Sequence, residues 1–225
     1  MDTRTLLQTM RRAPEIRVVA PGEYLHLGFE YALTRILKRT PINLIPDILY
    51  VDWSTDGVRL NKSGKLQLWP IQISVSNIFE CKPEVVGVYK GVKKPISSKQ
   101  FLDDFINEVN TLIKKGGIMF MQKVIPIKLR VLIVDAVAKA YVLNHFSHVS
   151  KYPCSRCHII GKRYEKQIVF PGTTLRLRTD KEYAQMLDKN HHKGSSAISE
   201  LHMGLVSQVP GDAMHIAYEG VKKKY

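Results

Sequence analysis

Hydrophobic and polar residues alternate, or gather into short apolar runs, in four stretches of this chain. Stretches of this kind, bounded by Gly, Pro, Asn or Asp, are typical of β-strands. They cover residues 48–55, 66–76, 85–89 and 127–134. The first three follow one another closely and predict a meander, whereas the fourth predicts a buried strand further along the chain.

Three other stretches space their apolar residues as helices do. Residues 26–39 end in basic residues ahead of two prolines, which favours a helix that stops there. A second helix is expected to begin at Ser97 or Ser98 and to end before Gly116, with a wide apolar stripe between. Residues 136–146 predict a third helix directly after the fourth strand.

The predicted order is three strands, a helix, a fourth strand and another helix, which is the order of a ribonuclease H-like fold. We therefore expect an α/β protein with a mixed sheet flanked by helices, in which the first and fourth strands lie side by side. Three parts are predicted along the chain. They are an N-terminal lead-in and helix at 1–46, a partial ribonuclease H-like catalytic core at 47–147, and a zinc-type extension with a CxxC motif at 148–225.

Asp56 and Asp135 directly follow the first and fourth predicted strands. A carboxylate at the mouth of a buried strand is held by the sheet and still reaches solvent, so it can position Mg²⁺ against a phosphodiester. If the two strands are neighbours, both carboxylates could bind one Mg²⁺ or Mn²⁺ ion. The two aspartates are therefore the candidate catalytic and metal-binding residues.

Each aspartate also has an ordinary structural interpretation. An Asp-Gly pair after a strand is very often a turn, and Gly57 would supply the permissive backbone. Asp135 can cap the helix that follows it. A carboxylate at the end of an Ile- and Val-rich run is costly to bury without a metal, a base or a cap as partner. The residues alone leave both interpretations of Asp135 open.

The charge of the chain favours a polyanionic partner. The 225 residues include 34 Lys and Arg against 20 Asp and Glu, a formal net charge of +14. Basic residues cluster at Lys90-Lys93-Lys94, Lys114-Lys115, Lys162-Arg163 and Arg176-Arg178, where they could contact phosphates or simply face solvent. No apolar stretch approaches membrane-spanning length and no apolar signal core is visible, so we expect an intracellular protein that does not bind membranes.

Three cysteines do not make a disulfide framework, but two of them form a CxxC pair. Cys154 and Cys157 have the spacing of one half of a tetrahedral zinc site, and a complete site needs two more ligands. His191, His192 and His215 are candidates for these ligands. A redox-active pair is the alternative, although no Trp-Cys context precedes it.

Three blocks of the chain resemble the transposases of CACTA-type (En/Spm-like) DNA elements, especially their animal branch. The first is Tyr50-Val51-Asp52-Trp53-Ser54-Thr55-Asp56-Gly57-Val58 with Leu68-Trp69-Pro70-Ile71. The second is Val134-Asp135-Ala136-Val137-Ala138-Lys139-Ala140, followed by the CxxC pair, Phe170-Pro171 and Arg178-Thr179-Asp180. The third runs from Asp212 through Met214-His215 to Lys223.

The resemblance implies a DDE/D nuclease related to the V(D)J recombinase core, with Asp56 and Asp135 as its first two acids and with Mg²⁺ or Mn²⁺ as cofactor. In that family the third acid is a glutamate well beyond the Met-His block, after a pair of zinc-binding histidines. The present sequence stops at Tyr225. Glu219 does not match the position of the third acid, so we expect the catalysis to be absent or impaired.

The leading hypothesis is thus a transposase-derived, nuclear DNA-processing core that in intact relatives cleaves DNA and transfers strands. The alternatives are a non-catalytic remnant that binds DNA or protein, and a ribonuclease H-like nuclease with a locally supplied third acid. DNA is the expected partner, self-association is open, and no small-molecule substrate is expected. Metal-dependent nicking of plasmid DNA would separate the catalytic hypotheses from the remnant.

Overall fold

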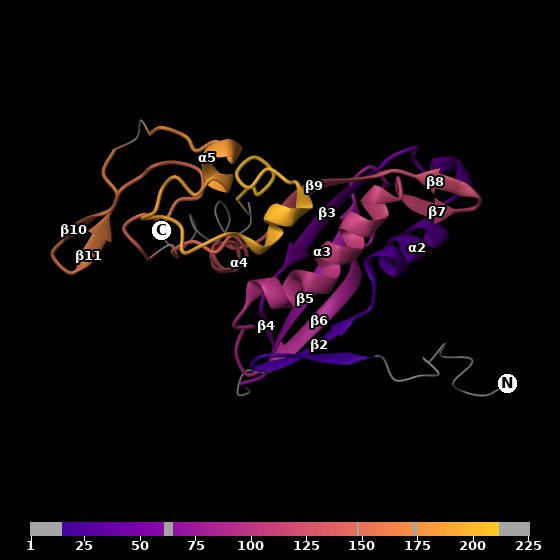
Figure 1. Cartoon of the computed structure of the whole chain (residues 1–225), viewed down its shortest axis with the longest axis horizontal. Coiled ribbons are helices and arrows are strands. Elements are labelled where there is room, and N and C mark those ends of the chain that lie inside the picture. Colours follow the sequence, from indigo (N-terminus) through magenta and orange to yellow (C-terminus); the bar gives the residue numbers. More distant parts are fainter. Residues whose placement is uncertain (1–14, 61–64, 148, 173–174, 212–225) are drawn as a thin grey trace.

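A computed structural model describes residues 15–60, 65–147, 149–172 and 175–211. A twisted mixed sheet with two long helices packed on one face forms one end of the molecule, and an extension with little regular structure forms the other (Figure 1). The sheet and its helices make the chain a mixed α/β protein. None of the helices in the described ranges has the length and apolar content that a membrane-spanning helix requires.

The large sheet has seven strands in the order β1-β2-β6-β5-β3-β9, with β4 paired to β5. Their bounds are β1 Ile16–Val19, β2 Gly22–His26, β3 Leu49–Thr55, β4 Val58–Arg59, β5 Gln67–Val75, β6 Glu84–Gly91 and β9 Ile127–Ile133. All pairs are antiparallel except β3 and β9, which are parallel. The sheet is therefore mainly antiparallel with one parallel pair at its edge.

The helices of this part are α2 (Phe29–Arg39), α3 (Ser98–Lys114) and α4 (Ala136–Val142), with a short turn η1 at Ile42–Leu44 and a hairpin of β7 (Ile118–Phe120) and β8 (Lys123–Ile125). The extension contains the hairpin β10 (Lys162–Tyr164) and β11 (Gln167–Val169), α5 (Asp180–Ala184) and η2 (Ala197–Leu201). Its end returns to the sheet, because the Leu132 amide donates to the Gln208 carbonyl (2.9 Å).

Aromatic side chains form the centre of the core between the sheet and the helices. Phe105 of α3 lies 4.9 Å from the Trp53 ring on β3 and 5.7 Å from Phe29 on α2. Tyr24 and Tyr89 pack against Phe101 in the same layer. All six rings are essentially inaccessible to solvent. Burying these rings together with the Leu, Ile and Val side chains around them supplies the main favourable free energy of this part of the fold.

The predicted strands and helices are present, with small shifts at their ends. The first and fourth predicted strands, β3 and β9, are adjacent and parallel as expected. The last predicted helix is shorter than its predicted 136–146, since α4 ends at Val142 and Asn144 adopts a left-handed backbone conformation (φ 52°). That conformation is incompatible with a continued right-handed helix.

The sequence pattern did not predict β1 and β2, which fall mostly in the supposed lead-in. They extend the sheet beyond β6, so the sheet continues across the predicted boundary at residue 46. β1 leaves Ile16 and Val18 exposed and buries only Val19 fully. A short edge strand with apolar residues on its open face gives no clean alternation, which explains why the pattern missed it.

Candidate functional site

The strands β3, β6 and β9 run in the same direction and end at the same edge of the sheet, which we call the carboxyl edge. Ser54 of β3 is paired with Ile133 of β9. Asp56 and Asp135 each follow this pair by two residues, just past the ends of their strands, so the chain carries both to the same edge of the sheet. Adjacent strands lie about 4.8 Å apart, and paired side chains point to the same side of a sheet.

Asp56 is held at a break in the strand and not in a tight turn. After Asp56-Gly57 the chain continues as β4, which pairs with β5 just as β3 does. The Asp56 Oδ1 atom accepts a hydrogen bond from the Gly57 amide (2.6 Å). The Trp69 indole lies so close below Gly57 that an added Cβ would come within 2.8 Å of the ring. Gly57 is therefore needed for this close packing, which fixes the backbone next to Asp56.

Asp135 caps the helix α4, as the structural interpretation predicted. Its Oδ1 atom accepts a hydrogen bond from the Ala138 amide (2.6 Å). The second carboxylate oxygen accepts no hydrogen bond from the described part of the chain. The cap therefore fixes the carboxylate at the carboxyl edge and leaves one oxygen for another partner.

A third aspartate lies on the same face of β3. Alternation along β3 puts Trp53 toward the helices, and hence Asp52, Ser54 and Asp56 toward the opposite face. Arg130 forms a two-pronged ion pair with Asp52, with the Arg130 Nε atom 2.6 Å from Asp52 Oδ1. The ladder between β3 and β9 shifts register at this point, and the bulge brings Arg130 onto Asp52.

The sequence analysis did not assign a role to Asp52. A carboxylate inside a strand, together with an arginine in the predicted partner strand, is the signal that could have found this pair. Asp56 comes four residues after Asp52, just past the end of β3, so the two lie about 13 Å apart at the usual rise of a strand. Asp52 is thus a structural acid and lies too far away to join the pair at the carboxyl edge.

The donor set of Asp56 and Asp135 fits Mg²⁺ or Mn²⁺. Mg²⁺ takes oxygen ligands and is commonly bound by one or two carboxylates, with waters and substrate phosphates completing the shell. Within the described ranges, no group of three or more His, Cys, Asp or Glu side chains is arranged to hold a metal ion. These ranges therefore supply two candidate ligands at the carboxyl edge and no third acid.

Comparison with models of known protein families finds no match for this chain, and comparison with curated proteins finds none either. The resemblance drawn from the three sequence blocks thus has no support from these comparisons. The candidate site is argued from the register, the hydrogen bonds and the charges alone.

The CxxC pair forms a compact turn in the extension. The Cys154 Sγ atom accepts from the Arg156 amide (3.4 Å), and burial together with a hydrogen bond to Cys154 raises the pKa of the Cys157 thiol. The predicted ligand His215 lies outside the described residues.

Arg178 holds the CxxC turn from inside the extension. Its Nε atom donates to the carbonyls of Cys154 (3.0 Å) and Cys157 (3.2 Å), and its Nη2 atom donates to Asp188 (2.6 Å). The Arg178 side chain is only 3% exposed. This residue belongs to a predicted basic cluster, but it is used for structure and is not available to DNA.

The histidines proposed as zinc ligands lie in a buried cluster with His145. His191 Nδ1 donates to the Tyr152 carbonyl (2.7 Å), and its other nitrogen contacts the Tyr183 hydroxyl (3.2 Å). The Nε2 atoms of His145 and His192 are buried without a hydrogen-bond partner in the described ranges. Burial lowers the pKa of His145 to about 3 and that of His191 to about 4, so both are neutral at pH 7.

The remaining basic clusters differ in their surroundings. Lys90 pairs with Glu23, and Arg176 pairs with Glu182. Lys114, Lys115 and the Lys162-Arg163 pair are exposed and form no ion pair within the described ranges. Only some of the predicted basic residues are thus free of acidic partners.

Proposed function

We propose that this chain is a transposase-derived DNA-processing core with a ribonuclease H-like sheet. The proposal is supported by an antiparallel meander of β3, β5 and β6, followed by α3 and then by β9 parallel to β3. The formal charge of +14 suits a polyanionic substrate. A DNA-processing role would place the protein in the nucleus.

The observation that carries the proposal is the parallel pairing of β3 with β9, because Asp56 and Asp135 follow these two strands at the same edge of the sheet. A divalent cation bound there would supply the positive charge that stabilises a phosphodiester during cleavage. The two side chains would hold that ion and fix its place relative to the sheet. Their positions are set by the Gly57 amide for Asp56 and by the start of α4 for Asp135.

A non-catalytic, DNA-binding remnant is the second candidate function. It is favoured by the capping role of Asp135, which gives this aspartate a purpose without any metal. We therefore predict that the 225-residue chain alone binds DNA and does not nick it. Two acids without a third hold a second metal ion poorly and leave the attacking oxygen unoriented.

Binding of Mn²⁺ to the purified protein tests the site directly. Electron paramagnetic resonance of free Mn²⁺ should show one weak site that is lost in both Asp56→Asn and Asp135→Asn. Asp103→Asn is the matched control, because Asp103 is an exposed carboxylate on α3 and should bind no ion. Equal Mn²⁺ binding by the wild type and both site variants would refute a shared metal site.

Nicking of supercoiled plasmid with Mn²⁺ separates the two candidate functions. No nicking is expected from the wild type. Nicking that disappears in both Asp56→Ala and Asp135→Ala would show that the remnant hypothesis is wrong. The search for a third acid would then turn to Asp212 and Glu219.

Zinc binding in the extension is a further proposal. The described residues offer only Cys154 and Cys157, half of a tetrahedral set, and His215 would have to contribute from outside the described ranges. Purified protein should carry substoichiometric zinc that a chelator removes easily, and Cys154→Ser should abolish it. Full occupancy that survives the chelator would show that the site is complete within this chain.

A further inference from the structure

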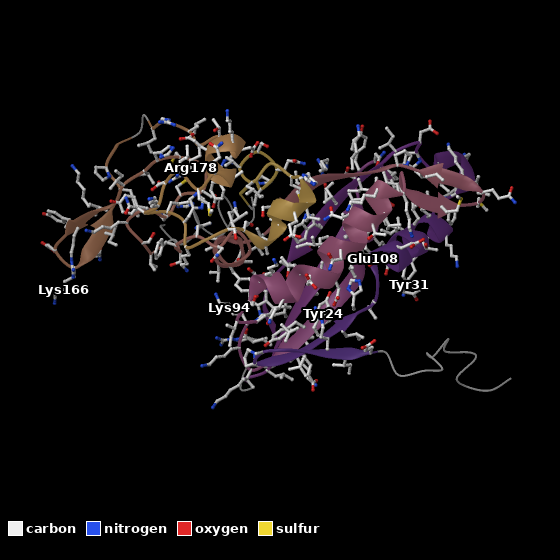
Figure 2. All side chains as sticks on the ribbon, in the orientation of Figure 1. Tyr24, Tyr31, Lys94, Glu108, Lys166 and Arg178 are labelled. Carbon is white, nitrogen blue, oxygen red and sulfur yellow. The ribbon has the colours of Figure 1, made fainter. Side chains whose placement is uncertain are left out.

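The hairpin of β10 and β11 is the outermost element of the extension (Figure 1). Its strands pair Lys162 with Val169, Arg163 with Ile168 and Tyr164 with Gln167. The two-residue turn Glu165-Lys166 joins them, and Figure 2 shows the Lys166 side chain at the outer end of the hairpin. Every side chain of the hairpin except that of Ile168 is exposed. The hairpin therefore presents side chains to solvent on both faces.

The hairpin carries positive charge that no acid of the described chain neutralises. Between Asp135 and Asp180 the sequence has eight Lys and Arg residues, and Glu165 is its only acid. The three cations of the hairpin, Lys162, Arg163 and Lys166, form no ion pair within the described ranges. Other cations of the extension are already paired, as Arg178 is with Asp188. The charge of the hairpin thus favours a polyanionic partner.

The base of the hairpin is fixed to the body of the extension. The Gly161 amide donates to the Lys151 carbonyl (2.7 Å). The Ile168 side chain packs so closely on Gly161 that an added Cβ would lie 2.4 Å from it. A bridge between Cys157 and Leu177 joins the segments that lead into and out of this region. Because the hairpin is held in place beforehand, little conformational entropy is lost when a partner binds.

The dimensions of the hairpin match the major groove of duplex DNA. That groove is about 12 Å wide and about 8.5 Å deep, and it admits a two-stranded ribbon. Three residues in each strand extend about 10 Å at the usual rise, so the tip can reach the floor of the groove. Successive residues of a strand point to opposite faces. Lys162 and Arg163 therefore point to opposite sides of the ribbon, as contacts to the two walls of a groove require.

We propose that the β10–β11 hairpin enters the major groove of duplex DNA. Lys162 and Arg163 contact phosphates on the two walls, and Lys166 and Gln167 at the tip face the base edges. Lysine and glutamine side chains both hydrogen-bond to base edges in the major groove. This inference rests on the proposed function for its partner, DNA, and adds the element that binds it.

Fluorescence anisotropy with a short labelled duplex, in EDTA and over a series of salt concentrations, tests the phosphate contacts. In Lys162→Gln/Arg163→Gln the affinity should fall about tenfold, and the slope of log K against log salt should shrink by about two, one unit for each lost contact. The matched control is Lys114→Gln/Lys115→Gln, which removes the same charge from exposed lysines at the end of α3. It should leave the slope unchanged. Equal effects of both variants would show that only net charge matters and would overturn the hairpin contact.

The charge-preserving variant Lys162→Arg/Arg163→Lys guards against an effect of misfolding, since it should retain wild-type affinity. An acidic polypeptide serves as the competitor that distinguishes DNA from polyanions in general. Unlabelled duplex should release the labelled duplex far better than polyglutamate of equal total charge. Equal release by polyglutamate would show a site for any polyanion and would overturn the groove contact.

Dye displacement tests which groove the hairpin enters. Methyl green binds the major groove of DNA and netropsin binds the minor groove. The wild type should release methyl green and leave netropsin bound. Lys162→Gln/Arg163→Gln should release less methyl green when compared at protein concentrations that bind an equal fraction of the duplex. Release of netropsin alone, or equal release of methyl green by the variant, would overturn the proposal.

The outcomes also separate this inference from the proposed function. EDTA removes any role of a metal, so a failure of the aspartates to bind Mn²⁺ leaves the DNA test intact. If the wild type binds DNA and Lys162→Gln/Arg163→Gln binds it equally well, the hairpin contact is wrong while a DNA partner stands. If the wild type binds no DNA at all, both the hairpin contact and the DNA partner are wrong.

Discussion

The sheet part and the extension share one apolar core but differ in how much regular structure and how many buried polar groups they contain. In the sheet part, stacked strands and interlocking aromatic rings exclude water from a large apolar core. The extension, residues 143–211, adds Ile198, Leu201 and Val209 to this core but has few regular hydrogen-bond ladders, and it also buries polar groups, such as Arg178 against Asp188 and the cluster around His191. Apolar burial has little pH dependence, whereas buried imidazoles and ion pairs depend strongly on pH.

This difference bears on how the carboxyl edge is built. Asp135 caps α4, the helix that leads from the sheet into the extension. The pairing of β3 with β9 brings the two aspartates to the same edge of the sheet, whereas the cap made by Asp135 depends on α4. Perturbing one part at a time therefore tests whether the two parts are stabilised independently, and the following predictions are ordered by the size of the expected effect.

The largest effect is expected from Phe105→Ala, which empties the centre of the core. Phe105 is fully buried between Trp53 and Phe29, so the substitution should lower the free energy of unfolding by about 4 kcal/mol. Urea unfolding followed by tryptophan fluorescence measures it, because both tryptophans lie in this part. Phe79→Ala is the control, since Phe79 is 88% exposed and its loss should change stability by about 0.5 kcal/mol or less.

Arg178→Ala should destabilise the extension by about 3 kcal/mol, because it leaves Asp188 and two carbonyl groups without their buried partner. Hydrogen exchange measured by mass spectrometry should show faster exchange in residues 149–211 and little change in β3 and β5. Arg176→Ala removes an exposed ion pair with Glu182 and should cost less than about 1 kcal/mol. Equal loss of protection in both parts would show that they unfold as one unit.

Acidification should open the extension before the sheet part. The pKa of His145 is held at about 3 and that of His191 at about 4, below the value near 6.5 of an unfolded histidine. As the pH falls, the unfolded chain therefore binds protons at a higher pH than the folded chain does. The stabilisation that comes from keeping these histidines neutral is complete above about pH 6.5 and is lost as the pH falls toward 4.

When the pH falls from 7 to 5, His145 alone should lower the free energy of unfolding of the extension by about 2 kcal/mol. Hydrogen exchange at each pH, relative to the exchange rate of unfolded peptides at that pH, measures the effect. His145→Gln should flatten the pH dependence. A sheet part that loses protection in parallel with the extension would contradict the proposed division of interactions.

The smallest effect concerns the aspartate at the boundary of the two parts. Asp135→Ala removes the cap of α4 and should lower stability by about 1 kcal/mol, whereas Asp135→Asn should not, because asparagine caps a helix as well as aspartate does. Thermal unfolding of the two variants in EDTA measures the difference. Equal stability of both would show that the Ala138 hydrogen bond contributes little, and the metal interpretation of Asp135 would gain weight.

The sequence determined the strands β3, β5, β6 and β9 and the long helices, because their apolar periodicity is local and strong. It also located Asp56 and Asp135 at the ends of two strands, and the order of elements was sufficient to predict that these strands are parallel neighbours. It left open whether Asp135 caps a helix, since a cap and a metal ligand require the same residue at the same place.

Only the tertiary structure decided which charged residues have partners. Asp52 and Arg130 are joined by a bulge between strands distant in sequence, and Arg178, which looks like a surface cation in the sequence, is buried by the CxxC turn. Residue type and spacing specify local structure, whereas burial and pairing of charge depend on contacts between distant segments, which no local pattern records.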